Sequence, residues 1–483
     1  MKVNPTNKKN VIIYGAGEAG RQLVISLKNN PEFKVIGFLD DNEKLKKKFL
    51  LSHKIYSPSD LRKLITTNYV DLVFLAMPSI GRNKRNQIIK KLNKYKLIVK
   101  TLPSISEIIN GKVTVSDIKD LNIDDLLNRE EVKPNIKLLN KSIKKKTVLV
   151  TGAGGSIGSE LCRQIIKLKP KKLLLLELNE FALYKIYEEL ISYYNSKKII
   201  PLLADTQDQA KLELIFETFN VETVYHAAAY KHVPLVEENI CSGIKNNVFS
   251  TLAIAKASII KKVSNLVMIS SDKAVRPTNI MGVSKRLSEL CMQGIYNNTK
   301  NIRTNFSIVR FGNVLESSGS VIPKFKKQIT EEGLVTLTHK EVTRYFMTIT
   351  EAAQLVIQAG AMGKRSEVFV LDMGKSVKII DLINKMIKLL GMSIKDRKNP
   401  NGDIKIKIIG LRPGEKLYEE LLIDAEALAT KNSNIFRAKE NFFSSDIFLI
   451  QLEKMQKALL NEDVGEALSI LKEVVPEWSN QES

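Results

Sequence analysis

A polar segment that follows an apolar run carries the residues best suited to chemistry. Ser271, Asp272 and Lys273 place a hydroxyl, an acid and an amine at successive positions, and a second amine, Lys285, follows in a predicted helix. The apolar run Asn265–Ile269 reads as a buried strand, and α/β folds bind ligands at the carboxyl ends of parallel strands. These residues therefore fit a general acid/base cluster. They fit equally well a solvated loop with an incidental salt bridge.

The elements that must position this cluster begin with a predicted strand, 147–150. It runs into Thr151-Gly152-Ala153-Gly154-Gly155-Ser156-Ile157-Gly158 and then into a helix that opens at Ser159. Glycines in this TGxxGxxG pattern let the backbone approach a phosphate at the helix N-terminus. The next predicted strand ends at Glu177, about twenty residues past the last glycine, where a carboxylate binds ribose hydroxyls. Because an acid there repels a 2′-phosphate, the pattern predicts NAD rather than NADP.

Two further strand ends complete the predicted cofactor site. The strand 199–203 is followed by an aspartate that can reach the adenine, and the strand 223–225 by small residues against which a cofactor can lie. We expect the following positions to contact NAD: Gly152, Gly155, Ser156, Ile157, Gly158, Glu177, Asp205, Thr206, Ala227, Ala228 and Ala229.

An earlier unit has a similar pattern. A short strand runs into GxGxxG at Gly15, Gly17 and Gly20, and the next strand ends in Asp40-Asp41. This predicts a Rossmann-like unit, in which the glycines serve either a nucleotide or tight packing alone. The expected organisation is a Rossmann-like domain at 1–115, a linker at 116–146, a catalytic domain at 147–424 and a helical tail at 425–483.

The composition limits the class of protein. The net charge of +23 suits anionic ligands, an acidic membrane face or nucleic acid. Because the excess is mostly lysine spread along the chain, we prefer a lysine-rich composition to nucleic-acid binding. The three cysteines form no CxxC pair, so neither a disulfide framework nor a metal site is expected. No apolar run reaches the length of a membrane span and the first residues are not a signal peptide, which predicts a cytoplasmic protein.

With these residues in hand, the chain resembles the extended short-chain dehydrogenase/reductases. Within them it resembles the bacterial polysaccharide-biosynthesis UDP-N-acetylglucosamine 4,6-dehydratases. The resemblance implies a doubly wound parallel sheet with a smaller C-terminal substrate-binding part. Long members usually carry N-terminal transmembrane helices, and none is present in this sequence. The motifs that carry the resemblance are TGAGGSIGSEL at 151–161, HAAAYKHVPLVE at 226–237, SSDKAVRPTNIMGVSKR at 270–286, RFGNVLESSGSVIP at 310–323, TRYFMT at 343–348 and GLRPGEKLYEELL at 410–422.

One position separates the members of this family. Short-chain dehydrogenases generally use Tyr-x-x-x-Lys, and here Met281 stands in the tyrosine's place with Lys285 retained. A methionine cannot accept the hydroxyl proton. Since the dehydratase subgroup also has methionine there, Met281 favours that subgroup over 4-epimerases and over the tyrosine-bearing inverting dehydratases.

The resemblance also implies a reaction and its residues. NAD takes hydride from C4 of the sugar, water is lost across C5–C6, and hydride returns to C6. Asp272 is assigned as the acid and Lys273 as the base. Desolvation shifts the pKa of each in the required direction, protonating Asp272 and neutralising Lys273. Their mutual attraction opposes this, so the two are expected to point to different atoms. Ser271 and Lys285 position or relay the C4 hydroxyl proton, and Lys285 also holds the nicotinamide ribose.

The expected partners are a UDP-sugar and, because this fold commonly pairs through helices, further copies of the chain. A location at the inner face of the membrane is compatible with these expectations. One alternative function is UDP-sugar 4-epimerisation, and another is a non-catalytic NAD-binding scaffold or sensor of a glycan assembly complex. The candidates for binding the substrate are Asn313, Arg344 and Arg412, followed by Lys231, His232 and Asn247.

Overall fold

The computed structural model describes residues 8–28, 30–80, 82–95, 97–102, 119–120, 134–315, 317–423, 427–440 and 446–478. The chain divides into two compact units. The first comprises residues 1–130, 325–336 and 380–407, and the second comprises the remainder. The first unit thus includes two segments that the sequence analysis placed in the catalytic domain. Of the predicted linker 116–146, residues 116–118 and 121–133 lie outside the described residues.

The first unit is built on a seven-stranded sheet in the order β3-β4-β2-β1-β5-β6-β7. Helix α1 covers one face, and α2 and α3 cover the other. Gly15 has φ +113, and the carboxylate of Asp40 accepts a hydrogen bond from the backbone N–H of Ala16 at 2.8 Å. The elements are β1 (Lys9–Tyr14), α1 (Glu18–Leu27), β2 (Phe33–Leu39), β3 (Phe49–Leu50), β4 (His53–Tyr56), α2 (Leu61–Asn68), β5 (Leu72–Leu75), α3 (Arg82–Leu92), β6 (Ile98–Thr101) and β7 (Lys119–Asp120).

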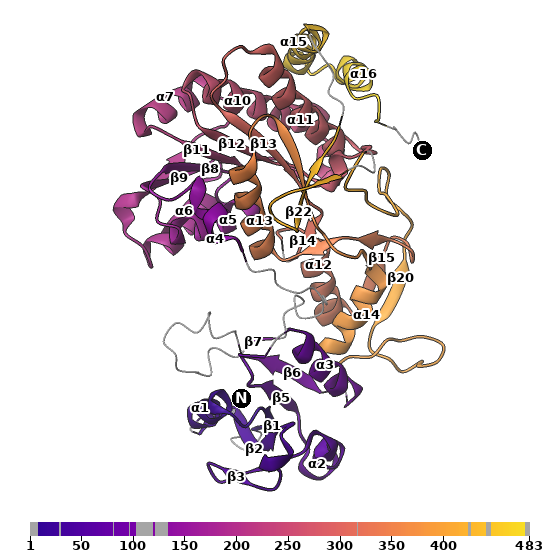
Figure 1. Ribbon diagram of the computed structural model, residues 1–483. Helices are drawn as coiled ribbons and strands as arrows, with labels where there is room; N and C mark the ends of the chain where they lie inside the picture. Colours follow the sequence, from indigo (N-terminus) through magenta and orange to yellow (C-terminus); the bar gives the residue numbers. More distant parts are fainter. Residues whose placement is uncertain are drawn as a thin grey trace, which may run out of the picture. The chain divides into compact units, whose positions relative to one another are not determined.

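The second unit is built on a nine-stranded sheet in the order β10-β9-β8-β11-β12-β13-β18-β22-β21 (Figure 1). Its first seven strands are parallel, and β22 and β21 are antiparallel. From β8 the chain adds β9 and β10 on one side and then β11, β12 and β13 on the other. Doubly wound folds bind ligands beside the strand at which this order reverses. The strands are β8 (Thr147–Thr151), β9 (Lys172–Glu177), β10 (Ile199–Leu203), β11 (Thr223–His226), β12 (Asn265–Ile269), β13 (Asn305–Arg310), β18 (Glu367–Leu371), β21 (Ala427–Ala429) and β22 (Ile435–Ala438).

Helices cover both faces of this sheet (Figure 1). On one face lie α4 (Ile136–Lys141), α5 (Ser156–Lys167), α6 (Glu180–Ile191) and α13 (Ile349–Met362). On the other lie α7 (Gln209–Phe219), α10 (Ser250–Ile260) and α11 (Ile280–Asn298). The predicted α/β fold, with a Rossmann-like unit ahead of a doubly wound parallel sheet, is confirmed. The remaining elements are α8 (Val233–Glu237), α9 (Ile240–Ile244), β14 (Asn313–Val314), α12 (Val321–Lys327), β15 (Leu334–Leu337), β16 (Thr343–Arg344), β17 (Phe346–Met347), β19 (Val377–Lys378), α14 (Ile379–Leu389) and β20 (Lys405–Ile408).

The C-terminal region differs from the prediction. The prediction of a helical tail over 425–483 is wrong for the first part of that segment. There β21 and β22 extend the sheet, and the helices α15 (Asp446–Leu460) and α16 (Val464–Val474) begin only after them. The short strand Ile435–Ala438 pairs with β18 and has a buried isoleucine at its start. Helices α15 and α16 share an apolar cluster with α11 and α9, so α11 is buried from Ile280 to Ile295 (Figure 1).

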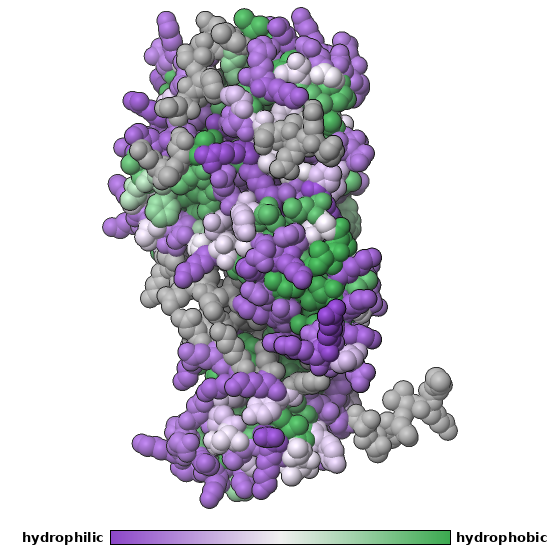
Figure 2. All heavy atoms as spheres, turned by 90° about the vertical axis from the view of Figure 1, so that its right-hand side faces the viewer, coloured by the Kyte–Doolittle hydropathy of each residue, from purple (hydrophilic) through white to green (hydrophobic). Residues whose placement is uncertain are grey.

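The surface agrees with the composition. Hydrophilic residues predominate on the face drawn in Figure 2, and hydrophobic residues form smaller patches between them. Within the described ranges, no helix combines the length and apolar character that crossing a bilayer requires.

Candidate active site

The glycine-rich turn between β8 and α5 forms the floor of the predicted cofactor site. Gly152 has φ +61, and a Cβ there would lie 2.8 Å from the backbone nitrogen of Ala228. A side chain at this position would therefore push apart the ends of β8 and β11. Helix α5 begins at Ser156, three residues earlier than expected, so Ser156 and Ile157 belong to its first turn.

The acid at the end of β9 holds this turn in place. The carboxylate of Glu177 accepts hydrogen bonds from the backbone N–H groups of Gly154 at 3.0 Å, Leu178 at 3.0 Å and Asn179 at 3.1 Å. At the end of β10, Asp205 accepts from the backbone N–H of Gln207 at 2.9 Å, and Thr206 is buried. The structure thus brings the predicted cofactor residues to one edge of the sheet, and their contacts with NAD stay a prediction.

The end of β11 is fixed by a buried histidine. The ring of His226 pairs with the hydroxyls of Thr151 at 2.8 Å and Thr251 at 3.2 Å. Burial and the nearby Lys285 ammonium lower the pKa of His226 to about 3, so its ring is neutral at pH 7. The backbone N–H of Ala227 donates to the carbonyl of Thr151 at 3.2 Å. These contacts set the small residues 227–229 against the glycine-rich turn.

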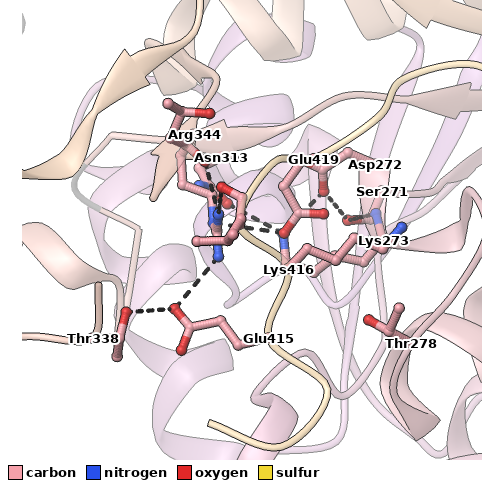
Figure 3. Close-up of polar contacts among 12 residues, drawn as sticks. Ser271, Asp272, Lys273, Thr278, Asn313, Thr338, Arg344, Glu415, Lys416 and Glu419 are labelled. Carbon is pink, nitrogen blue, oxygen red and sulfur yellow. Dashed lines mark hydrogen bonds and ion pairs between the residues drawn. The ribbon is translucent and has the colours of Figure 1, made fainter. Parts of the chain in front are cut away.

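The acid/base cluster lies at the carboxyl end of β12, in a short turn before α11 (Figure 3). The ammonium of Lys273 lies 3.0 Å from Oδ1 of Asp272 and 3.3 Å from Oε1 of Glu419. Ser271 donates from its hydroxyl to Oδ1 of Asp272 at 2.9 Å, and Lys273 also reaches Oδ1 of Asn313 at 3.5 Å. The cluster is therefore three interacting ionisable groups rather than an exposed surface ion pair.

Burial decides the protonation of Asp272. Its side chain is 1% exposed, and desolvation raises the pKa of its carboxyl despite the attraction of Lys273. Its second oxygen, Oδ2, has no hydrogen-bond partner among the described residues. The expectation of a protonated acid at this position agrees with the direction of the shift.

The expectation of a neutral amine at Lys273 is wrong. Burial lowers the pKa of Lys273, but the charges of Asp272 and Glu419 together outweigh it and raise that pKa above its ordinary value. The amine is therefore charged, not neutral. It also contacts Asp272 directly, and the substrate atoms that the two groups face stay a prediction.

Glu419 is the functional candidate that the sequence analysis missed. Its side chain is 3% exposed, and its Oε1 lies 3.6 Å from Nε of Arg344 as well as near Lys273. Burial raises the pKa of Glu419, but the surrounding cations, Lys273 first, outweigh this and lower it below its ordinary value. Its Oε2 accepts no hydrogen bond from the part of the chain that the structure describes. The cluster thus holds an ionised carboxylate with one oxygen free.

The segment that carries Glu419 is fastened across the loop between β12 and α11. Thr278 donates from its hydroxyl to the carbonyl of Gly414 at 2.8 Å, and Lys416 donates to the carbonyl of Val275 at 2.8 Å. Gly414 has φ +69, and a Cβ there would lie 2.7 Å from the carbonyl oxygen of Thr278. A glycine at this position allows the two loops to lie in contact.

Lys285 and Met281 lie behind the cluster on α11. Lys285 donates to the carbonyl of Ile269 at 2.7 Å, and burial lowers the pKa of its amine to about 8. Met281 is 4% exposed and packs in the apolar cluster that α11 shares with α9 and the C-terminal helices. Met281 therefore contributes apolar packing at the tyrosine's place.

The predicted substrate residues divide into two groups. Arg344 and Asn313 join the cluster, where the Arg344 guanidinium contacts Glu419 and, at 3.5 Å, Glu415. Asn247 does not join it, because its side chain is 1% exposed and holds the backbone of Tyr230 and the hydroxyl of Ser284. The remaining three, Lys231, His232 and Arg412, are exposed.

Comparison with known families decides the assignment. The family model described as polysaccharide biosynthesis protein matches residues 148–440, which is more than half of the chain. The chain belongs to the polysaccharide biosynthesis protein family. A second model, the PglD N-terminal domain, matches residues 10–92 in the first unit.

Relatives of the chain support the assignment over most of its length. It is 40% identical to the capsular polysaccharide biosynthesis protein CapD of Staphylococcus aureus, over 92% of this chain and 74% of that protein. The solved structure of Pen from Bacillus thuringiensis is 32% identical with a TM-score of 0.56, and covers 63% of this chain and 90% of that one.

Two further relatives of this family member have names that state a reaction. The UDP-glucose 4-epimerase of Rickettsia bellii is 31% identical over 66% of this chain and 96% of its own length. The inverting UDP-N-acetylglucosamine 4,6-dehydratase of Campylobacter jejuni is 29% identical over 62% of this chain and 82% of its own length. These similarities alone do not separate dehydration from epimerisation.

Proposed function

We propose that this protein is an NAD-dependent nucleotide-sugar 4,6-dehydratase that acts on UDP-N-acetylglucosamine. The observation that carries the proposal is the buried cluster of Asp272, Lys273 and Glu419 at the end of β12. It offers two carboxyl oxygens that have no partner among the described residues, one on Asp272 and one on Glu419, and both side chains contact a charged lysine. A 4,6-dehydration needs an acid for the C6 hydroxyl and a base for the C5 proton, whereas a 4-epimerisation needs neither at these atoms.

The residues at the edge of the sheet fit a dinucleotide. The turn at 152–158 presents glycine backbone at the start of α5, where a side chain would collide with the neighbouring strand end. Glu177 and Asp205 stand at the ends of β9 and β10, and Lys285 is the candidate for the nicotinamide ribose. NAD bound there would supply a reversible hydride acceptor for C4 and a donor for C6.

The protonation states suggest how the chain's own residues divide the elimination. Asp272, whose pKa is raised, donates a proton to the departing C6 hydroxyl. Glu419, whose pKa is lowered, accepts the C5 proton and so takes the base role first given to Lys273. Lys273 keeps its charge and stabilises the negative charge that develops at the C4 oxygen.

Ser271 and Lys285 are the candidates for handling the C4 hydroxyl proton. Ser271 already donates to Asp272, and the amine of Lys285, with a pKa of about 8, can exchange a proton near neutral pH. Met281 supports dehydration over epimerisation because the 4,6-dehydratases that the chain resembles also have methionine at this position.

One experiment tests the proposal directly. Purified protein is incubated with UDP-N-acetylglucosamine and the product is followed by mass. Loss of one water without added oxidant supports the dehydratase. An unchanged mass with inversion at C4 indicates the epimerase. Tight NAD binding without turnover indicates a non-catalytic scaffold or sensor. The homo-oligomer and the cytoplasmic location stay predictions.

A further inference from the structure

A network of five charged side chains lies beneath the site. Arg310 and Glu289 are fully buried, and the Arg310 guanidinium donates to both oxygens of Glu289, at 2.8 Å and 2.6 Å. The same guanidinium also contacts both oxygens of Glu440. Arg286 completes the network by contacting Glu289 at 3.1 Å, Glu440 at 3.3 Å and Glu477 at 2.6 Å.

The members of this network come from distant parts of the chain. Arg310 ends β13, while Arg286 and Glu289 lie on α11. Glu440 follows strand β22, and Glu477 follows the last helix, α16. The C-terminal region is thus joined to the catalytic sheet by charge pairs as well as by its apolar cluster.

Glu289 connects the network to the site by two routes. Its Oε1 accepts a hydrogen bond at 2.6 Å from the hydroxyl of Ser270, which immediately precedes Ser271. It also lies one helical turn beyond Lys285, and its negative charge partly offsets the burial that lowers the pKa of that lysine. The titratable groups that face Lys285 are Glu289 on its own helix and His226 on β11.

Stability alone is a weak reason for such a network. Taking charges out of water is costly, and replacing a buried ion pair by well-packed apolar residues is often neutral or stabilising. The network therefore calls for a role that apolar packing cannot fill. Orienting a hydroxyl and setting the charge of a lysine are roles of that kind.

We propose that Glu289 is a positioning residue for the dehydration. It fixes the end of β12 through Ser270 and maintains the charge of Lys285, while Glu440 and Glu477 hold the two arginines that orient it. This inference rests on the proposed function.

The kinetic test compares Ser270→Ala with Glu217→Gln. Ser270→Ala removes one hydrogen bond to Glu289 and leaves the ion pairs intact. Glu217→Gln removes a carboxylate of α7 that pairs with Lys261, and neither residue contacts a member of the network in the described structure. We expect kcat to fall roughly tenfold in Ser270→Ala with KM unchanged, as loss of one buried hydrogen bond suggests, and no change in Glu217→Gln. An unchanged kcat in folded Ser270→Ala overturns the Ser270 route.

The second test needs no turnover. The rate at which acetic anhydride modifies Lys285 is measured against pH by mass spectrometry, in the wild type and in Glu289→Gln. We expect the midpoint to move to lower pH in Glu289→Gln, because removing the carboxylate leaves burial unopposed. An unmoved midpoint in the folded variant overturns the Lys285 route. If Glu289→Gln does not fold, Glu477→Gln takes its place, with a smaller shift in the same direction expected and an unmoved midpoint again counting against the proposal.

The two tests separate this inference from the function on which it rests. A wild type that loses no water from the sugar refutes the dehydratase, and the labelling result still decides whether Glu289 maintains the charge of Lys285. A wild type that dehydrates, together with unmoved labelling and unchanged kcat in Ser270→Ala, refutes the positioning role alone.

Discussion

The ammonium of Lys273 lies 3.3 Å from the carboxylate of Glu419. The first residue belongs to the turn after β12, and the second to a loop that the chain reaches after eight further strands, β13 to β20. This contact makes the cluster a triad, and it reverses the charge state expected for the lysine.

Replacing Glu419 by glutamine removes the proposed base and keeps the shape of the side chain. We expect kcat to fall by about 10²–10⁴, the range that a general base contributes, with fold and cofactor binding retained. Glu420→Gln is the matched control, because Glu420 is adjacent to Glu419 in sequence but is half-exposed and pairs with Arg276. Steady-state kinetics with the nucleotide sugar measure both. Full activity in Glu419→Gln would exclude the base role.

Asp272→Asn and Lys273→Ala test the other two members of the triad. The asparagine cannot donate the proton that the departing hydroxyl requires, and the alanine removes the charge between two carboxylates. We expect folded protein with bound cofactor and dehydration reduced by roughly a hundredfold or more in each. Circular dichroism and product mass are the measurements. A variant that dehydrates at the wild-type rate refutes the role given to that residue.

Gly414→Ala tests how the Glu419 segment is fastened. Both Gly414 and Gly410 have positive φ, but a Cβ meets Thr278 only at Gly414 and meets no described atom within 4 Å at Gly410. We expect Gly410→Ala to cost about 1 kcal/mol from the backbone alone. Gly414→Ala should cost more and also lower kcat, because the segment must move. Equal melting temperatures and equal kcat in the two variants would contradict the fastening.

The buried network predicts a loss of stability in acid. Burial raises the pKa of Glu289, but Arg310 above all outweighs this and holds it at about 2, below the ordinary value of 4.5. A carboxyl whose folded pKa is lowered contributes stability that is present above its unfolded pKa and is lost as pH falls through the folded one. The melting temperature should therefore drop between about pH 4.5 and pH 2.

Thermal unfolding of Glu289→Gln over the same pH range supplies the comparison. The variant is expected to be less stable at pH 7 by about 3–5 kcal/mol, since it leaves a buried arginine short of a charge. Its stability should depend less on pH below 4.5. A wild-type and variant pair with parallel acid profiles would show that the acid sensitivity originates elsewhere.

Much of the fold follows from local patterns in the sequence. The glycine-rich turn of Gly152 and the acid Glu177 lie at a fixed spacing between apolar runs, and the structure places them together at one edge of the sheet. Local spacing fixes such elements because strand, turn and helix are contiguous in the chain. The strand Ile435–Ala438 was missed, because so short a run cannot be distinguished from a helical segment without its partner strand.

The charge state of the site depended on contacts that local patterns do not contain. Glu419 stands inside the recognised GLRPGEKLYEELL motif, but nothing in its neighbourhood states that it faces Lys273. The pKa of Lys273 depends on that contact, so the neutral amine could not be ruled out from the sequence. Arg310 was noted as part of a motif, and its pairing with Glu440 depends on strand β22, which the sequence analysis missed.

The charge network also constrains how the protein is made. A ribosome synthesises the chain from its N-terminus, so Arg286 and Arg310 emerge long before the carboxylates of Glu440 and Glu477 that contact them. Until then the nascent catalytic sheet holds two arginines with Glu289 as their carboxylate partner in this network, and α11 lacks its C-terminal cover. The active site consequently matures late in translation, and premature release of the chain before residue 440 should yield a protein that chaperones and proteases recognise as unfinished.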